Sequence, residues 1–185
     1  MSQTAEILAE AEQAFRKRGW EEALVGFQMV IDLEELLPAN ACSYHHALFM
    51  CGLTYIKLDH TEPASKVLLK LLKINDSHPG SYYGLGLRSV IIADRYQRQI
   101  EEESRHSNAE GSLQMSPCVV DCLREVAISE FSGAILKATG FPEWRWIAES
   151  AEILKIQQSM LVPHLASAAS VVTGGAGRSQ IRRLI

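Results

Sequence analysis

The sequence has no excess of basic residues and lacks the short motifs that many enzyme families carry. It contains 18 Lys and Arg against 22 Asp and Glu, which gives a net charge of -4. A nucleic-acid partner held by a basic surface is therefore not expected. No HExxH, GxSxG, Walker A or dinucleotide-binding motif is present. We predict that the chain is not an enzyme, with no catalytic residue and no cofactor.

Cysteine is scarce and follows no metal-binding spacing. The four cysteines form no CxxC pair. Cys118 and Cys122 are four residues apart and share one face of a predicted helix, but a zinc site would need two further ligands. Cys42 lies near His45 and His46, which leaves a metal site there as an alternative. We favour reduced cysteines that act as small core residues, and we predict no metal.

The start of the chain lacks the apolar run of a secretory signal. Glu6, Glu10 and Glu12 fall within the first twenty residues, and signal peptides and mitochondrial presequences are not acidic there. We therefore expect a cytoplasmic protein. With 185 residues, 47% hydrophobic and 22% charged, the chain has the composition of an ordinary globular domain.

Two glycines in similar apolar helical segments, Gly52 and Gly86, indicate an internal repeat. Ala64 follows Gly52 by twelve positions, with Leu68 and Leu71 after it. The spacing of these residues resembles the tetratricopeptide repeat (TPR), a helix-turn-helix unit of about 34 residues with small residues where its helices meet. Such units cannot bury their apolar faces alone, so they stack.

The resemblance implies an all-α, right-handed stack of two clear TPR-like units and a partial third, with additional C-terminal helices. The first helix pair fits residues 5–36 and the second fits 44–78. Ala23 and Ala64 occupy equivalent positions but are further apart than one repeat, so about seven extra residues are expected in 34–43. The first helix of the partial third unit is expected to begin near Ser81 and to run towards Ile100. No second helix of this unit is recognisable after it.

The predicted organisation has four parts. Residues 1–100 form the TPR-like repeats, and 101–117 form a polar loop because that stretch has almost no apolar residues. Residues 118–160 form two C-terminal helices, 118–139 and 142–160, that pack on the repeats. Residues 161–185 form a tail rich in small residues.

The resemblance also implies that the chain binds other proteins. We predict a non-enzymatic scaffold or adaptor that is a subunit of a larger complex. Some TPR proteins grip the acidic tails of chaperones, which takes Lys, Asn and Arg on the concave helices. The corresponding positions here hold Ala9, Gln13, Phe49, Met50 and Leu53, so we do not expect a chaperone-tail clamp.

The concave positions predict an apolar groove instead. Counted from Gly52 and Gly86, they include Phe49, Met50, Leu53, Ile56, Tyr83, Leu87 and Ile91. Two interpretations are open: the chain's own C-terminal helices fill the groove, with Ile147 and Leu154 as donors, or an apolar helix of a partner does. Further along, Trp144, Arg145 and Trp146 are possible interface anchors, because Trp and Arg are enriched at binding hot spots; the alternative is that one tryptophan simply packs inside.

The tail raises the possibility of membrane association. Residues 156–177 carry no formal charge and are followed by Arg178, an outline that resembles the tail anchor of the mitochondrial fission adaptor with a TPR-like fold. Residues 73–76 and 82–85 are similar to the soluble TPR subunit of the endoplasmic-reticulum membrane insertase complex. A membrane-associated TPR adaptor is therefore the alternative function, although Gln157, Gln158 and Pro163 disfavour a span.

Overall fold

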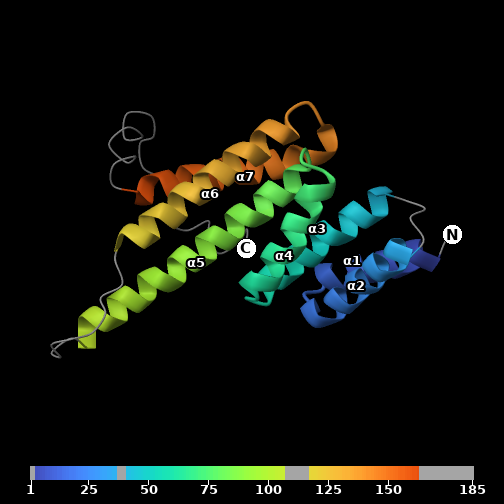
Figure 1. The fold of residues 1–185 in the computed structure, drawn as a ribbon, viewed down its shortest axis with the longest axis horizontal. Helices are drawn as coiled ribbons and strands as arrows, with labels where there is room; N and C mark the ends of the chain where they lie inside the picture. Colours follow the sequence, from blue (N-terminus) through green and yellow to red (C-terminus); the bar gives the residue numbers. More distant parts are fainter. Residues whose placement is uncertain (1–2, 37–40, 107–116, 163–185) are drawn as a thin grey trace. The chain divides into compact units, whose positions relative to one another are not determined.

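The computed structural model describes residues 3–36, 41–106 and 117–162, and every element in this part of the chain is a helix (Figure 1). The expected all-α class is confirmed. The elements are α1 (Gln3–Arg16), α2 (Trp20–Leu36), α3 (Ala41–Lys57), α4 (Thr61–Ile74), α5 (Pro79–His106), α6 (Pro117–Ala138), the 3-10 turn η1 (Pro142–Trp144) and α7 (Arg145–Leu161).

The chain divides into two compact units, Met1–Gly84 and Leu85–Ile185. The division falls inside α5, whereas the sequence predicted a boundary at residue 100. The contacts of two glycines explain the difference. A Cβ on Gly84 would lie 2.7 Å from the side chain of Leu68 in α4, whereas a Cβ on Gly86 would lie 2.5 Å from the ring of Phe131 in α6. The start of α5 thus belongs to the first unit, and the rest belongs to the second.

In the first unit, α1–α2 and α3–α4 are helical hairpins that end their first helices in the same way. Arg18 and Asp59 have positive φ angles of 64° and 65°. In each turn the next amide then donates a hydrogen bond to the carbonyl five residues earlier, the pattern of a Schellman motif. These bonds join Gly19 N–H to Ala14 O and His60 N–H to Tyr55 O, both at 2.9 Å. The offset between the two turns equals the offset between Ala23 and Ala64, so the turns are equivalent.

The cores of these two hairpins follow the same offset. The residues concerned are buried in both: Ala11, Ala23, Phe27 and Val30 in the first, and Gly52, Ala64, Leu68 and Leu71 in the second. The small residues let the helices approach. A Cβ added to Gly26 would lie 2.6 Å from the Cβ of Ala11, and one added to Gly52 would lie 2.7 Å from Leu68. The expected extra residues partly lengthen the helices, because α2 extends to Leu36 and α3 begins at Ala41.

In the second unit, α5 continues through the first part of the predicted loop. The prediction of a loop from residue 101 was wrong for 101–106, which are helical. Polar side chains four residues apart support this end of α5. Gln97 donates to Glu101 at 2.9 Å, and Gln99 donates to Glu103 at 3.2 Å. The rest of the predicted loop, 107–116, lies outside the described residues.

The third helical hairpin is complete, although the sequence indicated no second helix for it. Its second helix is α6, whose Ala127, Phe131 and Ala134 are all fully buried. Their spacing is that of Ala23, Phe27 and Val30 in α2. Because a Cβ on Gly86 would meet Phe131, the two helices approach as closely here as α3 and α4 do at Gly52. The sequence did not indicate α6 as the second helix of this hairpin because a long polar stretch separates α6 from α5.

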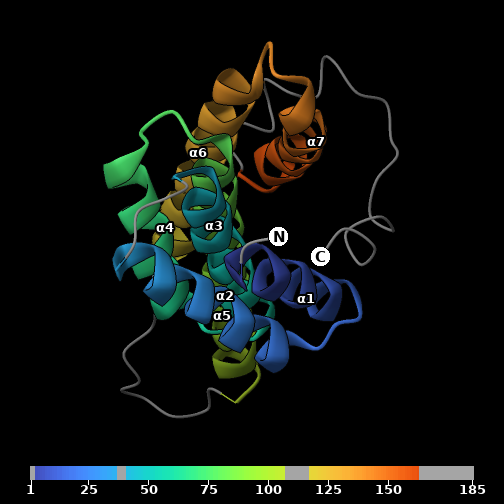
Figure 2. The same ribbon diagram turned by 90° about the vertical axis from the view of Figure 1, so that its right-hand side faces the viewer.

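Helix α7 packs along α6, and the two lie side by side in both ribbon views (Figure 1 and Figure 2). The turn between them contains Gly140 with φ of 89°, a conformation that glycine adopts without strain. Ile147, Ala151 and Leu154 form the buried face of α7, at the spacing that the sequence predicted for its apolar side.

Candidate functional site

The predicted groove residues are mostly buried, and they fall in both units. Phe49, Leu53, Ile56, Tyr83 and Leu87 are all less than a tenth exposed, whereas Met50 and Ile91 are half-buried. The residues up to Tyr83 belong to the first unit, and the last two belong to the second. They are therefore core residues and do not offer an open surface. Filling of a groove by the C-terminal helices or by a partner stays a prediction.

Phe49 is covered by residues of its own unit. A Cβ on Gly80, at the start of α5, would lie 2.7 Å from the Phe49 ring. The ring of His78 is 5.6 Å away, between centroids. The absence of a side chain at Gly80 thus allows the first turn of α5 to close over α3.

His78 is the centre of a small histidine cluster in the first unit. It is buried, and the ring of His45 approaches it edge-on at a centroid distance of 6.5 Å. Burial lowers the pKa of His78 from 6.5 to about 4, and the charges of His45 and His46 act in the same direction. His46 in turn pairs with Glu12 of α1 at 2.9 Å. The cluster holds a neutral imidazole in the core at pH 7, which makes it a source of acid sensitivity.

The proposed anchors lie at the start of α7 and are partly exposed. Trp146 is 47% exposed, whereas Trp144 is half-buried. Arg145 lies between them on the surface, where its Nε donates to Glu149 at 2.9 Å. The two tryptophans thus occupy different environments. Their role as anchors stays a prediction.

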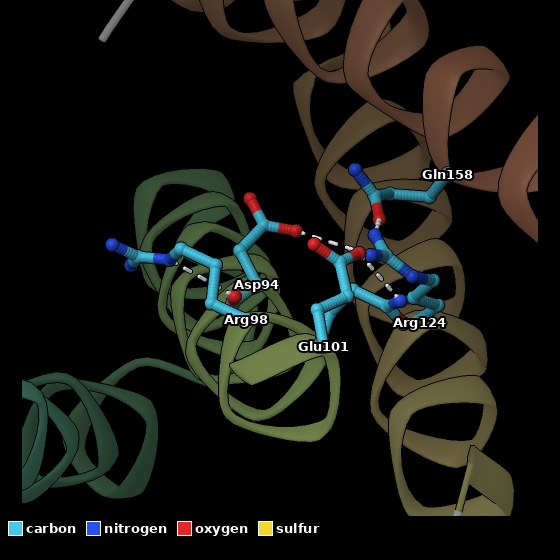
Figure 3. A network of polar contacts seen from close by, with 6 residues as sticks. Asp94, Arg98, Glu101, Arg124 and Gln158 are labelled. Carbon is cyan, nitrogen blue, oxygen red and sulfur yellow. Dashed lines mark hydrogen bonds and ion pairs between the residues drawn. The ribbon is translucent and has the colours of Figure 1, made fainter. Parts of the chain in front are cut away.

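A buried arginine network in the second unit escaped the sequence analysis. The guanidinium of Arg124 donates to Gln158 Oε1 at 2.7 Å and to Asp94 Oδ1 at 3.1 Å. Figure 3 shows these three side chains pointing toward one another from α6, α7 and α5, with the carboxylate of Glu101 beside the same guanidinium. The side chain of Arg124 is only 7% exposed, whereas that of Asp94 is 53% exposed.

One signal could have revealed this network. Arg124 follows Val120 by four residues and precedes Ala127 by three, so it stands on the apolar face of α6. A charge at such a position needs a partner. The partners themselves are 30 and 34 residues away in sequence, and no local pattern identifies them. The network ties three helices together and is a structural device, with no arrangement of a nucleophile and a base.

Helix α7 carries a second apolar stripe that is exposed. Ile153 and Ile156 are each 38% exposed and Met160 is 47% exposed. Their spacing of three and four residues places them along one side of the helix. The buried face of α7 lies on another side, so α7 is apolar on two sides. From the sequence, only the buried side, with Ile147 and Leu154, was predicted to be apolar. The exposed stripe, Ile153, Ile156 and Met160, is the candidate site and is called the α7 stripe below.

The described residues contain no group of three or more His, Cys, Asp and Glu side chains placed to hold a metal ion. Over the same ranges, none of the helices combines the length and the apolar character that crossing a bilayer requires. Most of the predicted tail, 163–185, lies outside the described residues. In comparisons with known proteins, no family model, no curated protein and no solved structure matched the chain.

Proposed function

We propose that this chain is a non-enzymatic scaffold or adaptor that binds an apolar helix of a partner protein. The α7 stripe carries the proposal. The terminal helices of a helical stack usually have a polar outer face, because nothing in the stack covers it. Helix α7 is the last described helix and instead exposes Ile153, Ile156 and Met160. Three such side chains on one side match the spacing used in helix-in-groove recognition.

The repeated hairpins support the same proposal. The small and large core residues recur at equivalent positions in α1–α2, α3–α4 and α5–α6. Helical repeats of this kind, including the TPR family that the sequence resembles, extend a surface by adding units without adding a catalytic centre. We therefore interpret the hairpins as the support of a binding face, and membership of the TPR family as a hypothesis that fits it.

A matched pair of double variants tests the proposal. Ile156→Glu with Met160→Glu places two charges on the α7 stripe. Val25→Glu with Met29→Glu makes the same change on α2, where Val25 is 61% and Met29 is 47% exposed. Each variant and the unaltered chain are used as bait in cell extract, and the bound proteins are identified by mass spectrometry.

We expect a defined set of proteins to bind the unaltered chain and the α2 variant but not the α7 variant. Each variant replaces a β-branched residue and a methionine four residues away. Non-specific hydrophobic binding should therefore be reduced equally in the α7 variant and the α2 variant. Equal binding to all three baits would overturn the proposal. If the unaltered chain binds nothing and only deletion of 163–185 creates binding, the chain's own tail occupies the stripe, and the proposal that a partner helix binds it fails.

A further inference from the structure

The outer faces of α2 and α4, the second helices of the first two hairpins, carry opposite charges. On α4 the exposed residues include three lysines on one side of the helix, Lys66, Lys70 and Lys73. Helix α2 contains no Lys or Arg, and its exposed residues include three acidic ones, Glu21, Glu22 and Asp32. The first unit thus presents one basic helix face and one acidic helix face.

Both faces also expose large apolar side chains. Val25 is 61% and Met29 is 47% exposed on α2, while Leu69 is 47% and Ile74 is 48% exposed on α4. Val25 and Met29 lie between the acidic residues of α2, and Leu69 lies among the lysines of α4. Apolar side chains within a polar rim are typical of a protein interface, where the charges select the partner.

The two faces lie on the same side of the first unit. Ala23 and Ala64 are equivalent core positions of α2 and α4, and the same offset relates Asp32 to Lys73. Equivalent positions of stacked repeats face the same side of the stack. One surface of the unit therefore carries both the acidic face and the basic face.

The local contacts of these charges leave them accessible. Lys66 pairs with Glu62 on its own helix at 2.9 Å, and these side chains are 75% and 80% exposed. Asp32 accepts a hydrogen bond from Gln28 at 2.9 Å, also on the surface. Exposed pairs of this kind contribute little to stability, so contacts with a second molecule can replace them at small cost.

The charge of the first unit favours a second copy of the chain over an extended anionic partner. Residues 1–84 contain 7 Lys and Arg against 11 Asp and Glu. A membrane or a nucleic acid that approached α4 would therefore be repelled by the rest of the unit. The α2 face of another copy is acidic and, like the α4 face, has exposed apolar side chains at its centre.

We propose that two copies of this chain form a two-fold symmetric dimer in which α2 of each copy packs on α4 of the other. Because a two-fold dimer brings the same surface of both copies together, the contact between an acidic and a basic face is made twice. Pairing α2 with α2, or α4 with α4, would place like charges opposite each other. The dimer uses none of the α7 stripe, so it is independent of the proposed scaffold function and leaves partner binding through that stripe unaffected.

Charge-reversal variants of the full-length chain test the dimer by analytical ultracentrifugation. Lys66→Glu with Lys73→Glu makes both faces acidic, and Glu21→Lys with Asp32→Lys makes both faces basic. We expect the unaltered chain to sediment as a dimer. Each double variant alone should raise the dissociation constant at least about 100-fold, because like charges then meet at both contacts. An equimolar mixture of the two variants should restore a dimer, since each contact again joins an acidic face to a basic one.

Arg16→Glu with Lys17→Glu is the matched control. It makes the same change in charge at the exposed end of α1 and should leave the dimer intact. Restored association in the mixture distinguishes a lost interface from a misfolded variant, and added salt should weaken the dimer of the unaltered chain because exposed charges are screened.

Four results would overturn the proposal. An unaltered chain that remains monomeric at about 0.1 mM has no such interface. Equal weakening by the α1 control, or a mixture of the two variants that does not associate, would show that the α2 and α4 charges do not form the contact. Species larger than a dimer would indicate an open head-to-tail contact and contradict two-fold closure.

Discussion

The two units of this protein use the same way of packing helices but different ways of connecting them. In the first unit, the hairpins close through short turns with one left-handed residue, Arg18 or Asp59. In the second unit, α5 and α6 are extended beyond their interlocking residues, and a buried arginine ties them to α7. The close contacts between a small residue on one helix and a large side chain on the next, such as Gly52 with Leu68 and Gly86 with Phe131, therefore set the packing of a hairpin. The connection between the two helices can vary in length.

The difference also concerns polar groups. The first unit buries a neutral histidine, His78, whereas the second buries a charged arginine, Arg124. Acid protonates a buried neutral imidazole and so destabilises the fold that buries it. An arginine side chain, in contrast, does not lose its proton in proteins. The two units should therefore respond differently to pH and to the loss of one partner.

The first prediction concerns the interlocking aromatic residue of each unit. Phe27 and Phe131 are fully buried at equivalent positions, so replacing either by alanine should cost about 3–5 kcal/mol of unfolding free energy. Trp20 reports on the first unit, and Trp144 with Trp146 reports on the second. In urea unfolding followed by fluorescence, Phe27→Ala should shift the Trp20 signal, and Phe131→Ala should shift the other.

The matched backgrounds are Trp20→Phe and the double variant Trp144→Phe, Trp146→Phe, which each leave one unit visible. If either alanine variant shifts both signals by the same amount, the two units unfold as one, and the comparison drawn above breaks down.

Acid should destabilise the first unit through His78. Its pKa is about 4 in the folded chain against 6.5 for an unperturbed histidine, so the unfolded state binds more protons between these values. The stabilisation that His78 gives the fold is fully present above pH 6.5. As the pH falls through 4, the free energy of unfolding decreases by at most about 3 kcal/mol. Urea midpoints of the Trp20 signal across this range measure it, and His78→Gln should flatten the profile.

Glu130 gives the second unit an opposite response. Burial raises the pKa of this carboxyl above 4.5, so the folded state binds the proton more readily than the unfolded state. This contribution favours the folded unit at low pH and fades as the pH rises through the raised pKa. If Glu130→Gln leaves the pH profile of the Trp144 and Trp146 signal unchanged, this part of the contrast is wrong.

Loss of one partner from the arginine network should have a moderate cost. Asp94→Ala leaves the buried guanidinium of Arg124 with a missing charge partner, and we expect a loss of about 1–3 kcal/mol in the second unit. The half-exposed position of Asp94 keeps the effect below that of a fully buried pair. The double variant Arg124→Met, Gln158→Leu removes the buried polar groups together and should be close to neutral. A double variant that is less stable than Asp94→Ala would contradict this interpretation.

The smallest effect is expected at the left-handed turn residues. Arg18→Gly and Asp59→Gly relieve a strained φ angle but increase the freedom of the unfolded chain, so each should raise stability by no more than about 1 kcal/mol. Arg18→Val should lower it, because a β-branched residue tolerates this conformation poorly. Thermal unfolding of the three variants measures the effect. A stabilising Arg18→Val would mean that the turn is not under strain.

Much of the fold was predictable from the sequence. The periodic apolar residues of α1 to α4 and the small residues Ala23 and Ala64 identified two hairpins with equivalent positions. The two C-terminal helices, predicted at 118–139 and 142–160, also lie close to α6 and α7. Such signals act within a few turns of helix, so they survive without knowledge of the rest of the molecule.

The functional residues were harder to predict. The apolar residues chosen as a groove are mostly buried, because apolar spacing alone does not separate a binding face from a core. The α7 stripe has the same composition as a core face, and only its exposure distinguishes it. Arg124 was visible as a charge on an apolar face, but Asp94 and Gln158 could not be paired with it from sequence.

The helical class, the approximate ranges of the two C-terminal helices and the equivalence of Ala23 and Ala64 in the first two hairpins could all be read from the sequence. Only the tertiary structure decided that α6 completes a third hairpin, that the unit boundary falls at Gly84 and Leu85, and which apolar residues stay exposed. The physical reason is one of range. Helix propensity, capping and periodicity act between residues a few positions apart, whereas the pairing of Gly86 with Phe131 depends on packing between helices that a long polar stretch separates.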